Sequence, residues 1–138
     1  MTAQLVVAAA LVDDLTRPTR LLAARRSAPP ALAGQWEFPG GKVEPEEDPV
    51  TALRRELREE LGVGIQLGQQ IAGPREGRWP LSVPGLTLVL WWAVPLGEPR
   101  PLEDHDALRW LARGQLSAVP WLASNAPMVE AVRASLEP

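Results

Sequence analysis

The feature that most constrains this chain is one segment with complete start and stop signals for a helix. Asp48 is a favoured N-cap residue and Pro49 suits the first helical position. Gly62 suits a left-handed cap at the other end. Between these ends three leucines recur at four-residue intervals: Leu53, Leu57 and Leu61. We therefore expect a helix that buries this apolar stripe against the rest of the fold.

The same segment gathers three glutamates, Glu56, Glu59 and Glu60, on one side of the predicted helix. At about 100° per residue they lie roughly a right angle from the leucine stripe, so they can border a cleft. Like charges three or four residues apart on a helix repel each other. A hard divalent cation such as Mg²⁺ cancels this repulsion and binds carboxylates together with substrate phosphates. The pattern predicts a metal-phosphate site, and the alternative is a solvated charged face.

The segment also resembles a family motif. Every specified position of the Nudix box is filled at its spacing: Gly41-x5-Glu47-x7-Arg55-Glu56-Leu57-x-Glu59-Glu60-Leu61-Gly62-Val63. Such a match arises by chance on the order of 10⁻⁹ times per starting position. The preceding residues 36–44, WEFPGGKVE, resemble the loop before the box in MutT-type members. The resemblance implies a single Nudix domain over residues 1–138, an α/β/α sandwich with a central mixed sheet.

The hydrophobic pattern agrees with an α/β fold. Apolar runs and turn signals predict strands at residues 3–12, 20–25, 36–38, 65–71, 86–95 and 108–111. A final helix is expected to open at Ser124 or Asn125. Because adjacent strand residues face opposite ways, at most one of Trp91 and Trp92 lines a given face, and we expect both to pack in the core. Two helices and several strands imply helices packed on a mixed sheet.

Composition narrows the functional class. The net charge of −3 argues against a general binder of nucleic-acid polymers, which usually carries a basic patch. The chain has no cysteine, which excludes disulfides and thiolate-bound zinc and fits the cytosol. Its N-terminal apolar run, residues 5–12, is far shorter than the ~20 residues that span a bilayer, so we expect a buried strand and no membrane attachment.

The Nudix resemblance assigns roles to the box residues. It implies that Glu59 and Glu60 are metal ligands, and that Glu56 is a metal ligand or a general base; we expect Glu56 to be the base. Arg55 is expected to orient Glu56 and to pair with Glu47, because a guanidinium can fork two carboxylates. The alternative for Arg55 is an ordinary surface arginine. The expected cofactor is Mg²⁺, with Mn²⁺ as a substitute.

The loop before the helix carries further candidates. Gly40 and Gly41 let the backbone approach the metal, and the resemblance implies that the carbonyl of Gly40 is a ligand. A tight turn that needs glycine is a second reading, and the two are compatible. Lys42 is placed to reach a phosphate, although an exposed lysine is often only solvated.

A last acidic ligand is expected in the loop after the long apolar strand. Counting back from Trp110, Asp104 stands where the family has glutamate, and the aspartate side chain is one methylene shorter. Asp104 binds directly or through water, or Glu103 takes its role. His105 is the sole histidine; it is either an acid–base group or a structural residue beside the site.

Three residues bear on the base. Asn125 matches the asparagine that reads oxidised guanine in MutT, and its alternative role is a helix cap. Arg26 lies where MutT has a base-contacting arginine, and Phe38 is placed to touch the base. Two other matches fail: Ala31 stands where MutT has a histidine, and Arg78 is shifted from the position of a second arginine.

The resemblance therefore implies metal-dependent hydrolysis of (deoxy)nucleoside triphosphates to monophosphate and pyrophosphate by a monomer or homodimer. The expected purpose is nucleotide-pool sanitation, with 8-oxo-dGTP or 8-oxo-GTP as substrate. The first alternative is a (d)CTP or 5-methyl-dCTP pyrophosphohydrolase. The second is a catalytically inactive nucleotide-binding module, which should lack some box glutamates. Diadenosine polyphosphates are less favoured because the chain has no tyrosine, and Pro80 is weak support for ADP-ribose.

Overall fold

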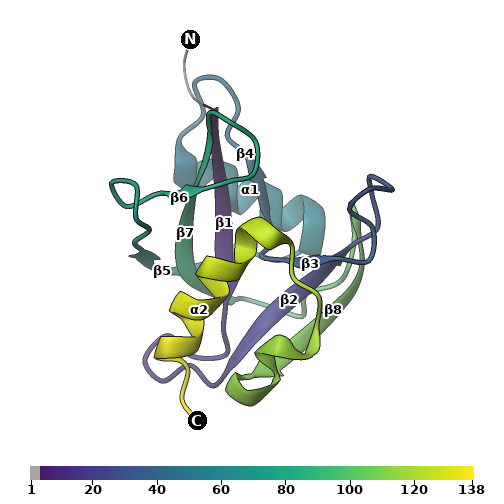
Figure 1. Ribbon diagram of the computed structural model, residues 1–138, viewed down its shortest axis with the longest axis vertical. Helices are drawn as coiled ribbons and strands as arrows, with labels where there is room; N and C mark the ends of the chain where they lie inside the picture. The colour runs from purple at the N-terminus through teal and green to yellow at the C-terminus, as the bar shows by residue number, and fades with distance from the viewer. Residues whose placement is uncertain (1–3) are drawn as a thin grey trace.

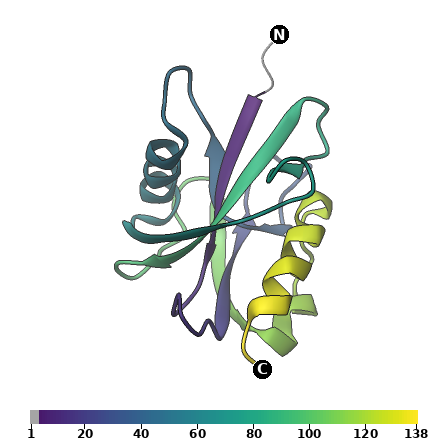
Figure 2. The ribbon, with the colours of Figure 1, turned by 90° about the vertical axis from the view of Figure 1, so that its left-hand side faces the viewer.

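The computed structural model describes residues 4–138, so residue 3 of the first predicted strand lies outside the described part. The strands form the middle of the molecule, with one long helix on each side (Figures 1 and 2). The elements are β1 (Gln4–Leu11), β2 (Arg20–Arg26), β3 (Trp36–Glu37), β4 (Gly40–Lys42), α1 (Pro49–Leu61), β5 (Ile65–Ile71), β6 (Trp79–Pro80), β7 (Leu86–Pro95), β8 (His105–Ala112), the 3₁₀ helices η1 (Arg113–Ala118) and η2 (Ala123–Asn125), and α2 (Ala126–Ser135).

The strands divide between two sheets. The larger sheet is mixed: β1 and β7 run parallel, β4 and β5 flank them antiparallel, and β6 pairs with β7. The smaller sheet is antiparallel, in the order β3-β2-β8. An isolated bridge between Val12 and Leu21 links the two sheets. The predicted sandwich with a mixed sheet is confirmed, with a second sheet that the sequence did not reveal.

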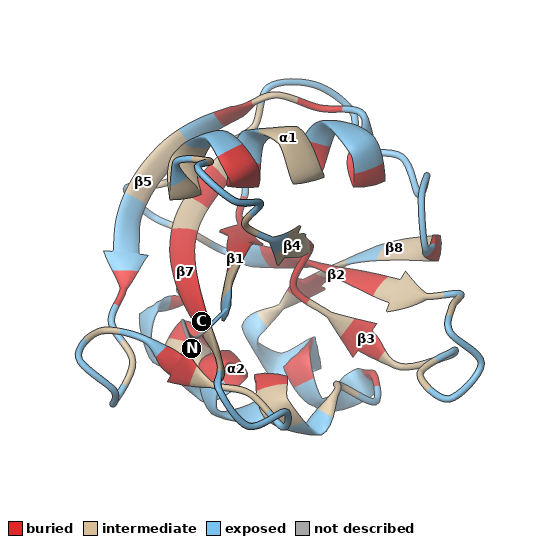
Figure 3. Ribbon diagram, turned by 90° about the horizontal axis from the view of Figure 1, so that it is seen from above, coloured by how far each residue is buried: buried red, intermediate tan, exposed pale blue. Residues whose placement is uncertain are grey.

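Helix α1 begins and ends at the predicted residues. The Asp48 side chain accepts hydrogen bonds from the backbone N–H groups of Val50 and Thr51, at 3.1 and 3.2 Å. Gly62 has a left-handed φ of 69°, and its N–H donates to the Arg58 carbonyl. The three stripe leucines are fully buried, and Figure 3 shows buried segments along α1. This packing fixes which side of the helix faces the sheet and therefore where its glutamates lie.

Each side of the larger sheet has its own hydrophobic core. Trp91 packs with the α1 leucines, and Trp92 packs against the core that includes Met128 of α2. The two tryptophans thus face opposite ways and serve packing, as predicted. No helix among residues 4–138 has the length and apolar character needed to cross a membrane.

Candidate functional site

The three glutamates of α1 differ in exposure. Glu60 is buried, at 6% exposed, Glu56 is half-buried, and the side chain of Glu59 is 44% exposed. The Glu60 carboxylate accepts a hydrogen bond of 3.2 Å from the backbone N–H of Gly40, on β4. Gly41 also approaches α1 closely, because a Cβ atom built there would overlap the Glu56 carboxyl group. The two glycines therefore bring β4 against the carboxylates.

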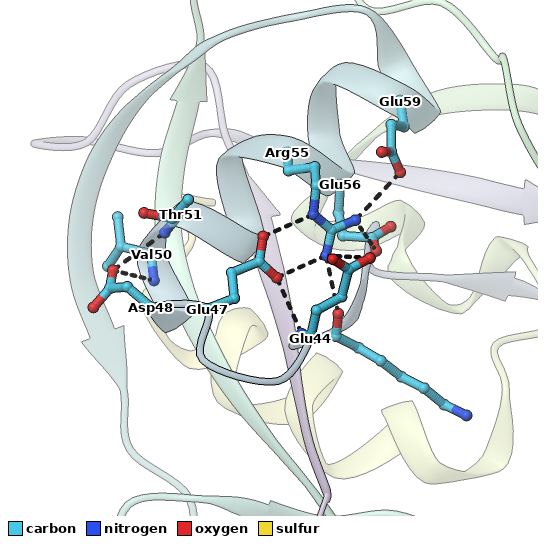
Figure 4. A network of polar contacts seen from close by, with 9 residues as sticks. Glu44, Glu47, Asp48, Val50, Thr51, Arg55, Glu56 and Glu59 are labelled. Carbon is cyan, nitrogen blue, oxygen red and sulfur yellow. Dashed lines mark hydrogen bonds and ion pairs between the residues drawn. The ribbon is translucent and has the colours of Figure 1, made fainter.

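Arg55 joins the carboxylates around the start of α1 (Figure 4). Its guanidinium donates two bonds to Glu47, at 2.8 and 2.9 Å, one to Glu56 at 2.9 Å and one to Glu59 at 3.4 Å. The hydrogen bonds from Arg55, with one from the Glu44 backbone, lower the pKa of Glu47 to about 2. Both contacts predicted for Arg55 are present, and they leave Glu56 held in one orientation.

Glu60 has the opposite electrostatic environment. Burial is the main cause that raises its pKa to about 9, and the nearby charges of Glu37 and Glu56 add to the effect. A buried carboxylate that is repelled by two others gains from a nearby cation. Oxygen donors of this kind suit Mg²⁺ or Mn²⁺. The carboxylate oxygens of α1 are thus chemically suited to bind a hard divalent ion.

The side chains of residues 4–138 do not already converge as a ligand set of three acidic, histidine or cysteine groups. Arg55 holds Glu56 and Glu59, while Glu60 is turned toward the Gly40 N–H. Glu59 and Glu60 thus have different hydrogen-bond partners.

A cavity of about 370 Å³ lies beside the carboxylates. Its walls come from β1, the segment around β3 and β4, the turn before β7 with the start of β7, and the 3₁₀ helix η2 with Leu122 before it. The lining residues are Val6, Val7, Ala8, Leu32, Gln35, Glu37, Phe38, Gly40, Leu81, Ser82, Val83, Leu86, Leu88, Leu122, Ala123, Ser124 and Asn125. A mostly apolar cavity of this size with a few polar groups is typical of a small-molecule site. Gly40 belongs both to the cavity wall and to the hydrogen bond with Glu60.

Asn125 and Phe38 both line the cavity and contact each other. The Asn125 Oδ1 atom accepts a 3.1 Å hydrogen bond from the Phe38 backbone N–H, and the Nδ2 group donates to the Ser124 hydroxyl at 3.4 Å. Asn125 precedes α2 but its side chain makes no capping hydrogen bond. The Phe38 ring packs against Trp121 with centroids 5.4 Å apart. The geometry thus favours a cavity role for Asn125 over a cap.

Other expected binding residues lie outside the cavity lining. The Arg26 guanidinium is held by Glu37 and by the Ala28 carbonyl, each at 2.8 Å. Lys42 is exposed, and its backbone carbonyl accepts a bond from Arg55. Arg78 lies in a local turn where its backbone pairs with Arg75. The residues that line the cavity therefore include no arginine or lysine.

The loop after β7 places its acidic residues and its histidine differently. Asp104 and Glu103 are exposed, whereas His105 is buried between Glu37 and Glu60. The sequence did not single out Glu37, whose side chain is only 13% exposed and lines the cavity. Its position in residues 36–44, the loop before the Nudix box, was the sequence signal that could have identified it. The turn residues Ser82 and Val83 carried no such signal.

The chain is similar to known proteins over nearly its whole length. Residues 3–132 match the family model of the NUDIX domain. The putative 8-oxo-dGTP diphosphatase 2 of Mycobacterium tuberculosis is 41% identical over 91% of this chain and 84% of its own. The CTP pyrophosphohydrolase of Escherichia coli K12 is 36% identical over 93% and 90% of the two chains.

A solved structure gives the same answer for the fold. The solution structure of the E. coli ORF135 protein superposes with a TM-score of 0.74 at 34% identity, covering 97% of this chain and 91% of that one. Nudix hydrolases generally need a divalent metal ion, which agrees with the carboxylates of α1. Since both the family model and these relatives cover most of its residues, the chain belongs to the Nudix hydrolase family.

Proposed function

We propose that the protein hydrolyses nucleoside triphosphates to a monophosphate and pyrophosphate with Mg²⁺, and that Mn²⁺ substitutes for it. The observation that carries the proposal is that the cavity and the carboxylates share one residue. Gly40 lines the cavity, and its N–H donates to buried Glu60. A base in the cavity would thus have its phosphates directed toward the acidic face of α1, where an ion can meet them.

The residues take the following roles in this proposal. Glu59, Glu60 and the Gly40 carbonyl would hold the ion, which when bound neutralises the triphosphate charge and orients it. Glu56 takes a proton from the attacking water, and Arg55 fixes the Glu56 carboxylate through its 2.9 Å hydrogen bond. The water oxygen bonds to the β-phosphorus as the bond to the α-phosphate oxygen breaks. Nucleoside monophosphate and pyrophosphate leave.

Two further groups remain candidates at the phosphate end. We propose that Asp104, or Glu103 in its place, completes the metal site through water, since both side chains are exposed on the loop before buried His105. Lys42, also exposed and next to Gly41, would contact a phosphate. None of these three residues lines the cavity, so loss of any of them should affect phosphate or ion binding more than base choice.

An oxidised guanine nucleotide is the first substrate that we propose. The supporting observations are the buried amide of Asn125 in the cavity wall and the 41% identical relative named as an 8-oxo-dGTP diphosphatase. The Asn125 Oδ1 atom accepts from the Phe38 N–H and one Nδ2 N–H donates to Ser124, so the second Nδ2 N–H would donate to a base carbonyl. The role would be sanitation of the free nucleotide pool in the cytosol. Arg26 would support the base site indirectly through Glu37.

A (d)CTP or 5-methyl-dCTP pyrophosphohydrolase is the second candidate. It is favoured by the E. coli relative named as a CTP pyrophosphohydrolase, at 36% identity. An inactive nucleotide-binding module is disfavoured, because all three box glutamates and Arg55 are present.

Substrate choice is tested by a screen of pyrophosphate release with Mg²⁺ over 8-oxo-dGTP, 8-oxo-GTP, CTP, dCTP, 5-methyl-dCTP and the ordinary nucleotides. Asn125→Ala should weaken binding of 8-oxo-dGMP far more than binding of dCMP, as measured by calorimetry. Glu130→Ala, which changes an exposed residue of α2, serves as the control. Equal losses for the two monophosphates would remove Asn125 from base selection.

A further inference from the structure

His105 lies between the cavity wall and the acidic face of α1. It is the only histidine of the chain, and its side chain is fully buried. The Nε2 atom is 2.9 Å from the Glu37 carboxylate, and the Nδ1 atom is 3.0 Å from the Glu103 carbonyl and 3.8 Å from the Glu60 carboxylate. One imidazole therefore contacts a residue that lines the cavity and faces the buried glutamate of α1.

The backbone around His105 is built to hold the ring in this position. A bulge in the pairing of β2 with β8 sets His105 opposite Arg26 and leaves Asp106 as the extra residue. Such bulges change the direction of a side chain. Asp106 pairs with exposed Arg25 at the surface, whereas His105 points into the interior. The preceding loop is tied to α1 because the Leu102 N–H donates to the Glu60 carbonyl at 2.9 Å.

The contacts continue on both sides of the ring. Glu37 Oε2 also accepts a 2.8 Å bond from Arg26, whose guanidinium is fixed by the Ala28 carbonyl. On the other side, Glu60 Oε1 accepts the Gly40 N–H. Both nitrogens of His105 face oxygen acceptors, and the ring separates two carboxylates that repel each other. Without the ring, Glu37 would keep only its bond from Arg26, and Glu60 only its bond from the Gly40 N–H.

We infer that His105 is a positioning residue, which fixes the Glu60 carboxylate for the divalent ion and the Glu37 carboxylate in the cavity wall. It touches neither ion nor nucleotide and acts through these two acids. The inference rests on the proposed role of Glu60 as a metal ligand. Mutation of a residue that orients a metal ligand typically lowers metal affinity or activity by about 10- to 100-fold.

The test compares three substitutions that keep different donors. His105→Asn keeps a donor near the Nδ1 position, His105→Gln keeps one near Nε2, and His105→Leu keeps neither. The measurements are Mn²⁺ binding by electron paramagnetic resonance without nucleotide, kcat and KM for the triphosphate, and thermal unfolding. Asp106→Asn is the matched control, since it changes the exposed neighbour on the same strand.

His105→Leu should bind Mn²⁺ roughly 10- to 100-fold more weakly than the wild type. His105→Asn should retain Mn²⁺ affinity and raise KM, because the contact with Glu37 is lost. His105→Gln should bind Mn²⁺ more weakly and keep the wild-type KM, because it retains a donor only for Glu37. A folded leucine variant with wild-type Mn²⁺ affinity overturns the inference. If that variant does not fold, unchanged Mn²⁺ affinity in His105→Gln overturns it equally.

Glu60→Gln in the same titration separates this inference from the proposed function. If Glu60→Gln binds Mn²⁺ as tightly as the wild type, Glu60 is not a ligand and the proposed metal site is wrong. If Glu60→Gln binds weakly while every His105 variant binds normally, the metal site stands and the positioning role of His105 is wrong.

Discussion

At the scale of single residues, Glu47 before α1 and Glu60 near its end have opposite environments. Arg55 lowers the pKa of Glu47 to about 2 through hydrogen bonds, whereas burial and two neighbouring carboxylates raise that of Glu60 to about 9. The sequence predicted Glu56, Glu59 and Glu60 on one side of a helix but did not predict that they differ in burial. Helical spacing predicts only the direction in which a side chain points. The burial of Glu60 depends on β4 and on the loop that precedes His105.

These shifts predict two separate pH dependences. Between pH 4.5 and about 9, folded Glu60 holds a proton that the unfolded chain has lost, so the free energy of unfolding falls as pH rises. Glu47 stabilises the fold above pH 4.5, and this contribution is lost as pH falls toward about 2. In a chelating buffer, urea unfolding followed by tryptophan fluorescence should therefore show stability decreasing with pH in the first window, and Glu60→Gln should flatten the curve.

Glu130→Gln, which changes an exposed carboxylate of α2, should leave the slope of that curve unchanged. A slope in Glu60→Gln equal to that of the wild type would show that another group causes the dependence.

The two adjacent glycines should respond differently to alanine. A Cβ at Gly41 would overlap the carboxyl end of the Glu56 side chain, while one at Gly40 would overlap the backbone of Val7 and Ala8. Gly41→Ala should therefore fold with nearly normal stability and lose roughly 10²-fold in kcat, since Glu56 is displaced. Gly40→Ala should lower the melting temperature strongly. Circular dichroism measures the melting temperatures of the two variants, and steady-state kinetics measures kcat. Equal melting temperatures would contradict the different overlaps described for Gly40 and Gly41.

At the scale of elements, local signals predicted long helices and strands well and short ones poorly. Asp48 and Gly62 cap α1 as expected, because capping depends on residues adjacent in sequence. The short strands β4 and β6 and the helix η1 have too few residues for a repeating pattern, so they went unpredicted. Strand β8 is longer than expected, since its first residues pair with β2 across a bulge that no periodicity reveals.

Packing of the α1 leucines stabilises the helix, whereas the repulsion between its glutamates destabilises it. Leu57→Ala should reduce the free energy of unfolding by about 2–5 kcal/mol, because Leu57 is fully buried and its truncation leaves a cavity. The same truncation at Leu96, which is 67% exposed, should cost roughly 0.5 kcal/mol or less. Chemical denaturation measures both. Similar losses at the two leucines would contradict the packing described for α1.

At the scale of the whole molecule, the family motif predicted the sandwich, while the second sheet and the cavity required the structure. The cavity walls come from β1, the β3–β4 segment, the turn before β7 and the helix η2, which are far apart in sequence. Residue periodicity identifies strands and not their partners, so no local pattern brings Asn125 to Phe38. Likewise, the resemblance that suggested Arg26 as a base contact does not show that its guanidinium bonds Glu37, which lines the cavity.

The central claim is that the acidic face of α1 performs metal-dependent pyrophosphate release with Glu56 as base. The most direct measurement is Mg²⁺-dependent release of pyrophosphate and nucleoside monophosphate by the wild type and by Glu56→Gln under saturating nucleotide. The wild type should release the two products in equal amounts, and Glu56→Gln should be slower by roughly 10²- to 10⁴-fold while remaining folded. A near-normal kcat in Glu56→Gln, or release of inorganic phosphate in place of pyrophosphate, would contradict the claim.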